Sequence, residues 1–306
     1  MEKFKIKSDI DGLELGVLST EPGFTPIGIV QINHGMSEHK ERYLPFMEYL
    51  SENGFVCVIH DHRGHGESVK SREDLGYFYE SGADGLIEDA YKVMEVIKGK
   101  YPELPFYLFG HSMGSLVVRA FVKKYDDEID GLIVCGSPSE NKMAVVAKWM
   151  IRSIFIPIKG SRFRSRLIQK LAFGSFCKAF PEEHNESNWV CSDHSVVERY
   201  EKDPLCGFIF TLDGFETLFS IMNRVYDSKG WSVSNIEMPI YFLSGWEDPC
   251  RISDGKFMQA AAKMKEIGYE NIDIKIYGKV RHEILNERIK ETVYRDILYW
   301  LKENQS

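Results

Sequence analysis

Short apolar runs alternate with amphipathic runs along two stretches of this chain, and that alternation constrains the fold more than any other feature. Six apolar runs are expected to form strands, at 27–32, 55–59, 106–109, 131–135, 240–243 and 272–277. The amphipathic runs between and after them predict helices at 42–53, 86–97, 115–124, 254–267 and 289–301. Two alternating runs, 3–8 and 13–18, flank the turn signal Asp11-Gly12 and predict a further pair of strands. Such an order is typical of an α/β fold: a mostly parallel central sheet with helices on both faces.

The alternation is interrupted between Pro138 and about Asn235, where the sequence indicates helices and loops without strands. We therefore expect a core domain made of residues 1–137 and 236–306, and an inserted helical cap, or lid, of residues 138–235. The inserted segment begins just after the strand that ends at Cys135. Because the carboxyl ends of parallel strands are where α/β proteins place their sites, the cap is expected to cover one.

The segment Gly110-His111-Ser112-Met113-Gly114 joins a predicted strand directly to a predicted helix. A Gly-x-Ser-x-Gly turn in this context is typical of a nucleophile elbow, which holds the serine hydroxyl above the edge of the sheet. Glycine is required two positions to either side because a side chain there would collide with the strand or the helix. The Met113 amide, at a helix N-terminus, is expected to face an oxyanion.

A serine nucleophile needs a base, and in this topology the base follows the last strand. His282 is the only histidine beyond residue 194, and it lies just after the run 272–277. The acid that orients it is expected after the preceding strand. Asp248, three residues after Gly245 and before a turn-forming proline, is the expected acid, and Glu247 is the alternative. The resulting chain order, serine, then acid, then histidine, is the order of α/β hydrolases.

A second oxyanion donor is expected after the first central strand, in Asn33-His34-Gly35-Met36. Gly35 lets the backbone turn so that the Met36 amide can face the Met113 amide, and His34 is interpreted as a brace for this loop. The cluster His60, His62 and His65 invites a metal-site interpretation, but the glycines and serine around it favour a shaped loop beneath the elbow.

Taken together, these motifs resemble the α/β-hydrolase superfamily, and more narrowly its monoacylglycerol lipase and lysophospholipase group, which is also grouped with serine aminopeptidase-like hydrolases. The resemblance is carried by His34-Gly35-Met36-Ser37-Glu38-His39, Arg42-Tyr43, Asp61-His62-Arg63-Gly64-His65-Gly66-Glu67-Ser68, the elbow, Gly245-x-x-Asp248 and Arg281-His282-Glu283. It implies the α/β-hydrolase fold and a serine esterase that cleaves small lipid-like esters, of monoacylglycerol or lysophospholipid type, through an acyl-enzyme without a metal or organic cofactor. An amidase or aminopeptidase on the same fold, and an inactive hydrolase-fold binding protein, are the alternatives.

The expected cap has two halves of different character. Residues 141–180 hold nine lysines and arginines and no acid, interleaved with large apolar side chains. That half is interpreted either as a solvated outer face or as a peripheral contact with anionic lipid or an anionic head group. In the other half, Phe208, Phe215, Phe219 and Met222 are expected either to line an acyl pocket or to form the core of the cap.

Charge and cysteine content narrow the remaining possibilities. The net charge of −8 argues against general nucleic-acid binding. The six cysteines form no Cys-x-x-Cys pair, which is typical of a reduced protein. The chain starts without an apolar signal region and has no run of about 20 apolar residues, so a cytoplasmic location is expected.

Overall fold

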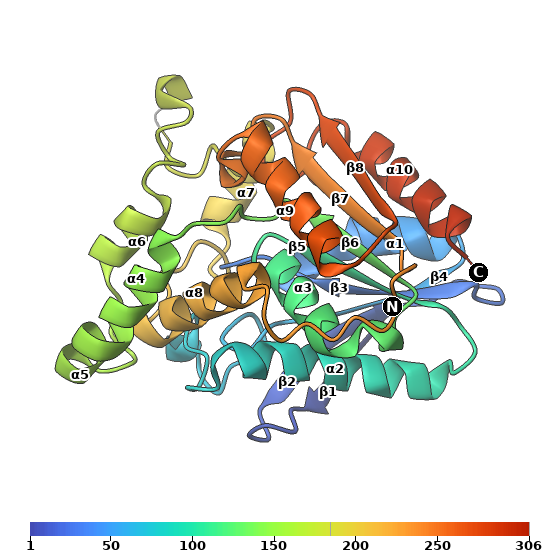
Figure 1. Cartoon of the computed structure of the whole chain (residues 1–306), viewed down its shortest axis with the longest axis horizontal. Coiled ribbons are helices and arrows are strands. Elements are labelled where there is room, and N and C mark those ends of the chain that lie inside the picture. The colour runs from blue at the N-terminus through green and yellow to red at the C-terminus, as the bar shows by residue number, and fades with distance from the viewer. Residues whose placement is uncertain (184, 306) are drawn as a thin grey trace.

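A computed structural model describes residues 1–183 and 185–305; His184, in the expected cap, and Ser306, in the expected core, lie outside the described residues. The central feature is an eight-stranded sheet with the strand order β1-β2-β4-β3-β5-β6-β7-β8 (Figure 1). Strands β1, β2 and β4 pair antiparallel, and every pairing from β4 across to β8 is parallel. The prediction of a mostly parallel sheet is therefore confirmed.

The strands lie close to the predicted runs. Their bounds are β1 Glu2–Lys7, β2 Glu14–Thr20, β3 Gly28–Asn33, β4 Phe55–His60, β5 Phe106–His111, β6 Gly131–Cys135, β7 Ile240–Gly245 and β8 Ile272–Tyr277. Strands β3 to β7 are buried along their whole length. Continuous apolar runs suit a sheet that is covered on both faces, because neither face of such a strand meets water.

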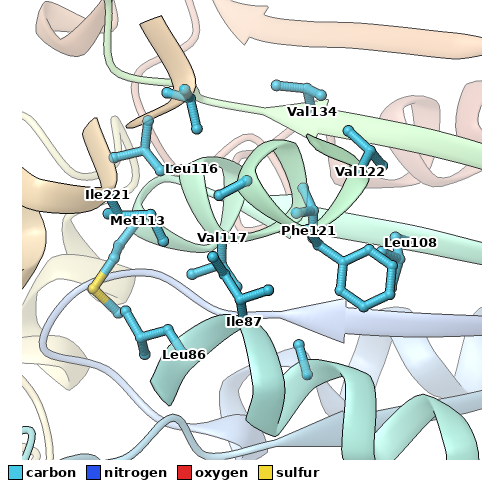
Figure 2. Close-up of a cluster of buried hydrophobic side chains, with 14 of the residues drawn as sticks. Leu86, Ile87, Leu108, Met113, Leu116, Val117, Phe121, Val122, Val134 and Ile221 are labelled. Carbon is cyan, nitrogen blue, oxygen red and sulfur yellow. The ribbon is translucent and has the colours of Figure 1, made fainter. Parts of the chain in front are cut away.

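Helices cover the two faces of the sheet. On one face α1 (Leu44–Glu52) and α10 (Lys290–Glu303) contribute to one buried apolar cluster. On the other face lie α2 (Gly82–Lys100), α3 (Met113–Tyr125) and α9 (Asp254–Ile267). Figure 2 shows α3 at the centre of this second cluster, with side chains of α2, of β5 and β6, and of a helix from the inserted segment gathered around it.

The segment between β6 and β7 is helical. Its helices are α4 Met143–Met150, α5 Ile156–Lys159, α6 Arg166–Phe173, α7 His194–Lys202 and α8 Leu212–Tyr226, and a π-helical turn at Ile151–Phe155 joins α4 to α5. Helix α8 packs against α2, α3 and α4, whereas α4 to α6 project away from the sheet at the left of Figure 1. Ile221 of α8 reaches the core cluster beside Met113 and Leu116 (Figure 2). Among the described residues, no helix is both long and apolar enough to cross a membrane.

Two helices start earlier than their apolar spacing predicts. Helix α2 begins at Gly82, four residues before the predicted start, because its first turn contains small and acidic residues that carry no apolar signal. Helix α3 begins at Met113 rather than Ser115, so the elbow itself supplies the first helical turn. The earlier start of α3 places the Met113 N–H among the first four of the helix, which have no partner within it.

Candidate active site

The serine of the elbow has a strained, left-handed backbone conformation at the tight turn between β5 and α3. Ser112 has φ 54° and ψ −117°, and its N–H donates to the Cys135 carbonyl of β6 at 2.9 Å. A Cβ on Gly110 would come within 2.4 Å of the Gly114 carbonyl oxygen, and one on Gly114 within 2.0 Å of the Asn33 carbonyl oxygen. Both glycines are thus required, and the close approach of α3 to β3 depends on the second.

The predicted base and acid are in direct contact. His282 Nδ1 lies 2.9 Å from Asp248 Oδ2, and both side chains are buried. The other oxygen of Asp248 accepts a hydrogen bond from the Cys250 N–H at 2.8 Å, which fixes the carboxylate. Glu247 is exposed to solvent, so the geometry pairs His282 with Asp248 and not with the alternative acid. Burial disfavours the imidazolium, but the carboxylate of Asp248, with smaller contributions from Glu283 and Glu38, outweighs burial and raises the pKa of His282.

Ser112 and His282 line the same cavity, although no hydrogen bond joins their side chains within the described part of the chain. The imidazole of His282 lies between two other rings: its centroid is 4.7 Å from that of His111 and 5.0 Å from that of Trp189. Trp189 belongs to the inserted segment, and the Glu283 N–H donates to the Val190 carbonyl at 2.8 Å. The loop that carries the base is therefore attached to the segment that covers the site.

The two expected oxyanion donors, Met36 and Met113, both line this cavity. Within the described residues, neither backbone N–H donates to a side chain or to a carbonyl of another segment, which leaves both available to a ligand. The loop that carries Met36 is held by Glu38, whose Oε1 accepts from the Gly35 N–H at 2.5 Å and from Tyr43 Oη at 2.9 Å.

Arg42 joins this loop to the loop of the base, a link that motif reasoning missed. Its guanidinium lies 2.6 Å from a carboxylate oxygen of Glu38 and 2.6 Å from each carboxylate oxygen of Glu283. Arg42 and Glu283 are 241 residues apart in the chain. The sequence therefore shows two charged residues but does not indicate that they pair. Although burial opposes ionisation of Glu38, the charge of Arg42 keeps the pKa of Glu38 well below its ordinary value.

The cavity has a volume of about 850 Å³ and is lined mostly by apolar side chains. Three of the four expected pocket residues, Phe208, Phe219 and Met222, lie on its wall. Phe215 does not, so its expected place there is wrong: it is fully buried and packs between the rings of Phe210 and Phe219. Its position on α8 turns it toward the core cluster. A helical apolar pattern alone does not distinguish a side chain of the core from one on the wall of a pocket.

The nine basic residues of 141–180 do not line the cavity. Several are engaged with the protein itself: Arg162 pairs with Asp74, and Arg164 donates to the carbonyl oxygens of Ile209 and Glu73. Lys148 and Arg152 lie 4.0 and 3.9 Å from Glu216 Oε1. Part of the basic run thus balances acids and carbonyl groups of neighbouring segments.

The histidine cluster is closely packed and adjoins His34, on the loop that carries Met36. His34 Nε2 accepts from the His62 N–H at 2.9 Å, and the His34 ring centroid is 4.4 Å from that of His62 and 5.2 Å from that of His65. Burial lowers the pKa of His60 to about 3 and that of His65 to about 4. These imidazoles are neutral at ordinary pH and brace the loops on either side.

Comparison with known proteins gives consistent matches. The family described as serine aminopeptidase, S33, matches residues 25–289. A monoacylglycerol lipase of Mycolicibacterium smegmatis is 24% identical over 92% of this chain and 90% of its own length, and the monoglyceride lipase of Rattus norvegicus is 23% identical over 95% and 88%. A thermostable carboxyl esterase from Bacillus coagulans, solved with glycerol, superposes with a TM-score of 0.92 at 24% identity, covering 100% of this chain and 99% of its own. The predicted α/β-hydrolase fold is confirmed.

Proposed function

The chain belongs to the serine aminopeptidase S33 family, and on that premise we propose that it hydrolyses carboxylic esters of small, neutral, lipid-like molecules of the monoacylglycerol type. The observation that carries the proposal is the convergence of Ser112, the His282–Asp248 pair and the Met36 and Met113 amides on one apolar cavity. The names of the lipase relatives and of the esterase neighbour support the same reaction class.

In the proposed mechanism, His282 Nε2 removes the hydroxyl proton of Ser112 while the serine oxygen attacks the ester carbonyl carbon. Asp248 holds the Nδ1–H tautomer, and the Met36 and Met113 N–H groups bind the oxyanion. Collapse of the tetrahedral intermediate breaks the bond to the alcohol, which leaves with the proton from His282. Water, deprotonated by His282, then releases the acid and restores Ser112. The serine hydroxyl must approach the imidazole when substrate binds, as is common for sites without ligand.

The lining of the cavity favours a neutral substrate over an acidic one. Its volume falls within the roughly 300–1,000 Å³ typical of small-molecule sites. The charged side chains that line it are carboxylates, Glu38, Glu186 and Glu283, and no lysine or arginine of the described chain joins them. Arg42 balances only part of this charge through its pairs with Glu38 and Glu283. A phosphate head group would still meet net negative charge, so we favour monoacylglycerols over anionic lysophospholipids.

Turnover on a matched substrate panel tests the proposal. We expect hydrolysis of monoacylglycerols and short neutral esters, slower hydrolysis of lysophosphatidic acid with the same acyl chain, and no turnover by the matched Ser112→Ala variant. Faster release of p-nitroaniline from amino-acid p-nitroanilides than of p-nitrophenol from esters would favour the aminopeptidase alternative. Faster hydrolysis of lysophosphatidic acid than of the monoacylglycerol would contradict the inference that the carboxylates lining the cavity disfavour anionic substrates.

We also propose that residues 138–235 act as a cap that contacts anionic lipid. Large apolar side chains of its first half are exposed, including Trp149 at 60%, Ile158 at 71% and Leu171 at 77%, and basic residues lie among them. Because Leu167 and Leu171 also border the cavity, such a contact would bring the mouth of the cavity to the lipid. Binding to phosphatidylglycerol vesicles should weaken with salt and with Trp149→Ala, whereas equal binding to neutral vesicles would contradict a role for charge.

The six cysteines carry free thiols. We propose a cytoplasmic location, because five of the six are buried as small apolar side chains, a use of cysteine that is typical of reducing compartments.

A further inference from the structure

We propose that His39, Asp203 and Cys206 form a binding site for a thiophilic divalent cation, of which Zn²⁺ is the best fit, at the junction of the core and the cap. One ligand atom from each residue lies within 4.8 Å of the other two. Imidazole nitrogen, carboxylate oxygen and cysteine sulfur are the donors that Zn²⁺ takes in proteins, and the sulfur disfavours Mg²⁺ or Ca²⁺. The proposal concerns a structural site and does not depend on the proposed ester hydrolysis.

A local turn holds Asp203 and Cys206 close together and directs the aspartate carboxylate toward His39. Asp203 follows α7, its Oδ1 accepts from the Leu205 N–H at 2.8 Å, and its carbonyl accepts from the Cys206 N–H at 3.0 Å. This closed turn leaves Asp203 Oδ2 free to point at His39 Nε2, 2.9 Å away. Ligands around a tetrahedral zinc are separated by about 3–4 Å, so small side-chain movements would admit the ion.

The second ring nitrogen of His39 contacts a carboxylate, as is usual for histidines that bind zinc. Its Nδ1 lies 2.8 Å from Glu41 Oε2, on the side of the ring away from Asp203. A carboxylate that accepts a hydrogen bond from the second ring nitrogen fixes the tautomer and orientation of a ligating imidazole. His39 and Cys206 are buried, while the Asp203 side chain is 31% exposed, so water has access from the aspartate side and can complete a tetrahedral set.

The neighbouring cation does not preclude the site. Arg42 lies over the ring of Tyr200, with its Cζ 5.0 Å from the ring centroid, and its charge is held by the carboxylates of Glu38 and Glu283. Asp203 contributes one negative charge to the ligand set. Cys206 contributes a second when the ion binds, because its thiol then releases a proton to the buffer and becomes a thiolate. The ion would therefore meet a net negative ligand set.

The ligands come from the two parts of the molecule that surround the reacting serine. His39 lies three residues beyond Met36, and Asp203 and Cys206 belong to the inserted segment. Two hydrogen bonds already join these segments: the Gly207 N–H donates to the Ser37 carbonyl at 2.9 Å, and Ser37 Oγ donates to the Phe208 carbonyl at 2.7 Å. A bound ion would reinforce this junction and stabilise the folded chain.

Co²⁺ titration of the chelator-treated full chain tests the site without reference to turnover. We expect one equivalent to produce a thiolate-to-cobalt charge-transfer band, abolished by added Zn²⁺. The band should be lost in Cys206→Ser and weakened in Asp203→Asn. Glu41→Gln should lower the affinity by about 10–100-fold, the usual effect of removing such a partner.

Cys250→Ser is the matched control, because Asp248, Cys250 and His282 also place three donor atoms within 4.8 Å of one another. Loss of the band in Cys250→Ser and its retention in Cys206→Ser would place the ion at the triad and overturn the proposal, as would the absence of any band. In a second readout, Zn²⁺ should raise the melting temperature of the wild-type chain and leave that of Cys206→Ser unchanged. An equal rise in both would also overturn the proposal.

Discussion

The ring of Trp189 packs on the ring of His282, with 5.0 Å between their centroids. A side chain of the inserted segment thus contacts the base that the core supplies, and backbone hydrogen bonds attach Trp189 and Val190 to the same loop. The segment that covers the cavity therefore also positions the proposed base.

Replacing Trp189 tests that coupling. Trp189→Ala should lower kcat/KM on a short neutral ester by about 10–100-fold, because small displacements of a catalytic group are costly. Trp189→Phe should recover most of the loss. The exposed Trp149 provides the matched control, and an equal effect of Trp149→Ala on this soluble substrate would indicate general damage to the inserted segment instead.

Asp248→Asn should reduce kcat by about 10⁴-fold, because an amide favours the wrong imidazole tautomer. Steady-state kinetics on a short ester measure the effect. Glu247→Gln is the control, since Glu247 is exposed and one position away, and it should stay close to wild type. The assignment of the acid is wrong if the glutamate variant is the more damaging of the two.

Ser112 should be the single residue that a fluorophosphonate labels. Ser112→Ala and His282→Ala should each abolish turnover while the circular dichroism spectrum and melting curve remain those of a folded chain. Peptide mapping of the labelled protein locates the adduct. An adduct on another serine, or persistent turnover by Ser112→Ala, would refute the mechanism.

The pH dependence should reflect the raised pKa of His282. Burial works against the charged imidazole, but the contact with Asp248, together with the charges of Glu283 and Glu38, outweighs it, so protonation persists above the ordinary value of about 6.5. Only the neutral imidazole can accept the serine proton, so kcat/KM should rise with pH through a midpoint above about 6.5. In Asp248→Asn the charge of Asp248 is lost while those of Glu283 and Glu38 remain, so the midpoint of the residual activity should move below that of the wild type.

Cys250 should make the enzyme sensitive to bulky thiol reagents. Its thiol lines the cavity near His282, but burial and the Asp248 charge raise its pKa well above the ordinary value, so the reaction should be slow and should accelerate with pH. Cys250→Ser should remove most of the inhibition. Cys177, which also borders the cavity, supplies the control: protection by Cys177→Ser instead would reassign the effect.

Sequence alone determined the features that depend on neighbours in the chain. The order of apolar and amphipathic runs predicted six strands of the sheet, and residue-by-residue alternation on either side of Asp11-Gly12 predicted the other two, because burial of a strand or of one helix face leaves its mark on nearby residues. The Gly-x-Ser-x-Gly turn placed Ser112 because its steric demands involve residues two positions apart. The order of strands then limited the candidates for base and acid to the loops that hold His282, Asp248 and Glu247.

Tertiary structure decided everything that depends on contact between distant segments. The contact between Asp248 and His282, the burial of Phe215 and the bridge from Arg42 to Glu283 each follow from how the helices and loops pack. The same is true of His39 and Asp203, which are 164 positions apart in the chain and 2.9 Å apart in space. Local periodicity indicates that a side chain is buried. Which residue it contacts depends on the packing of the whole chain, and a short stretch of sequence does not determine that packing.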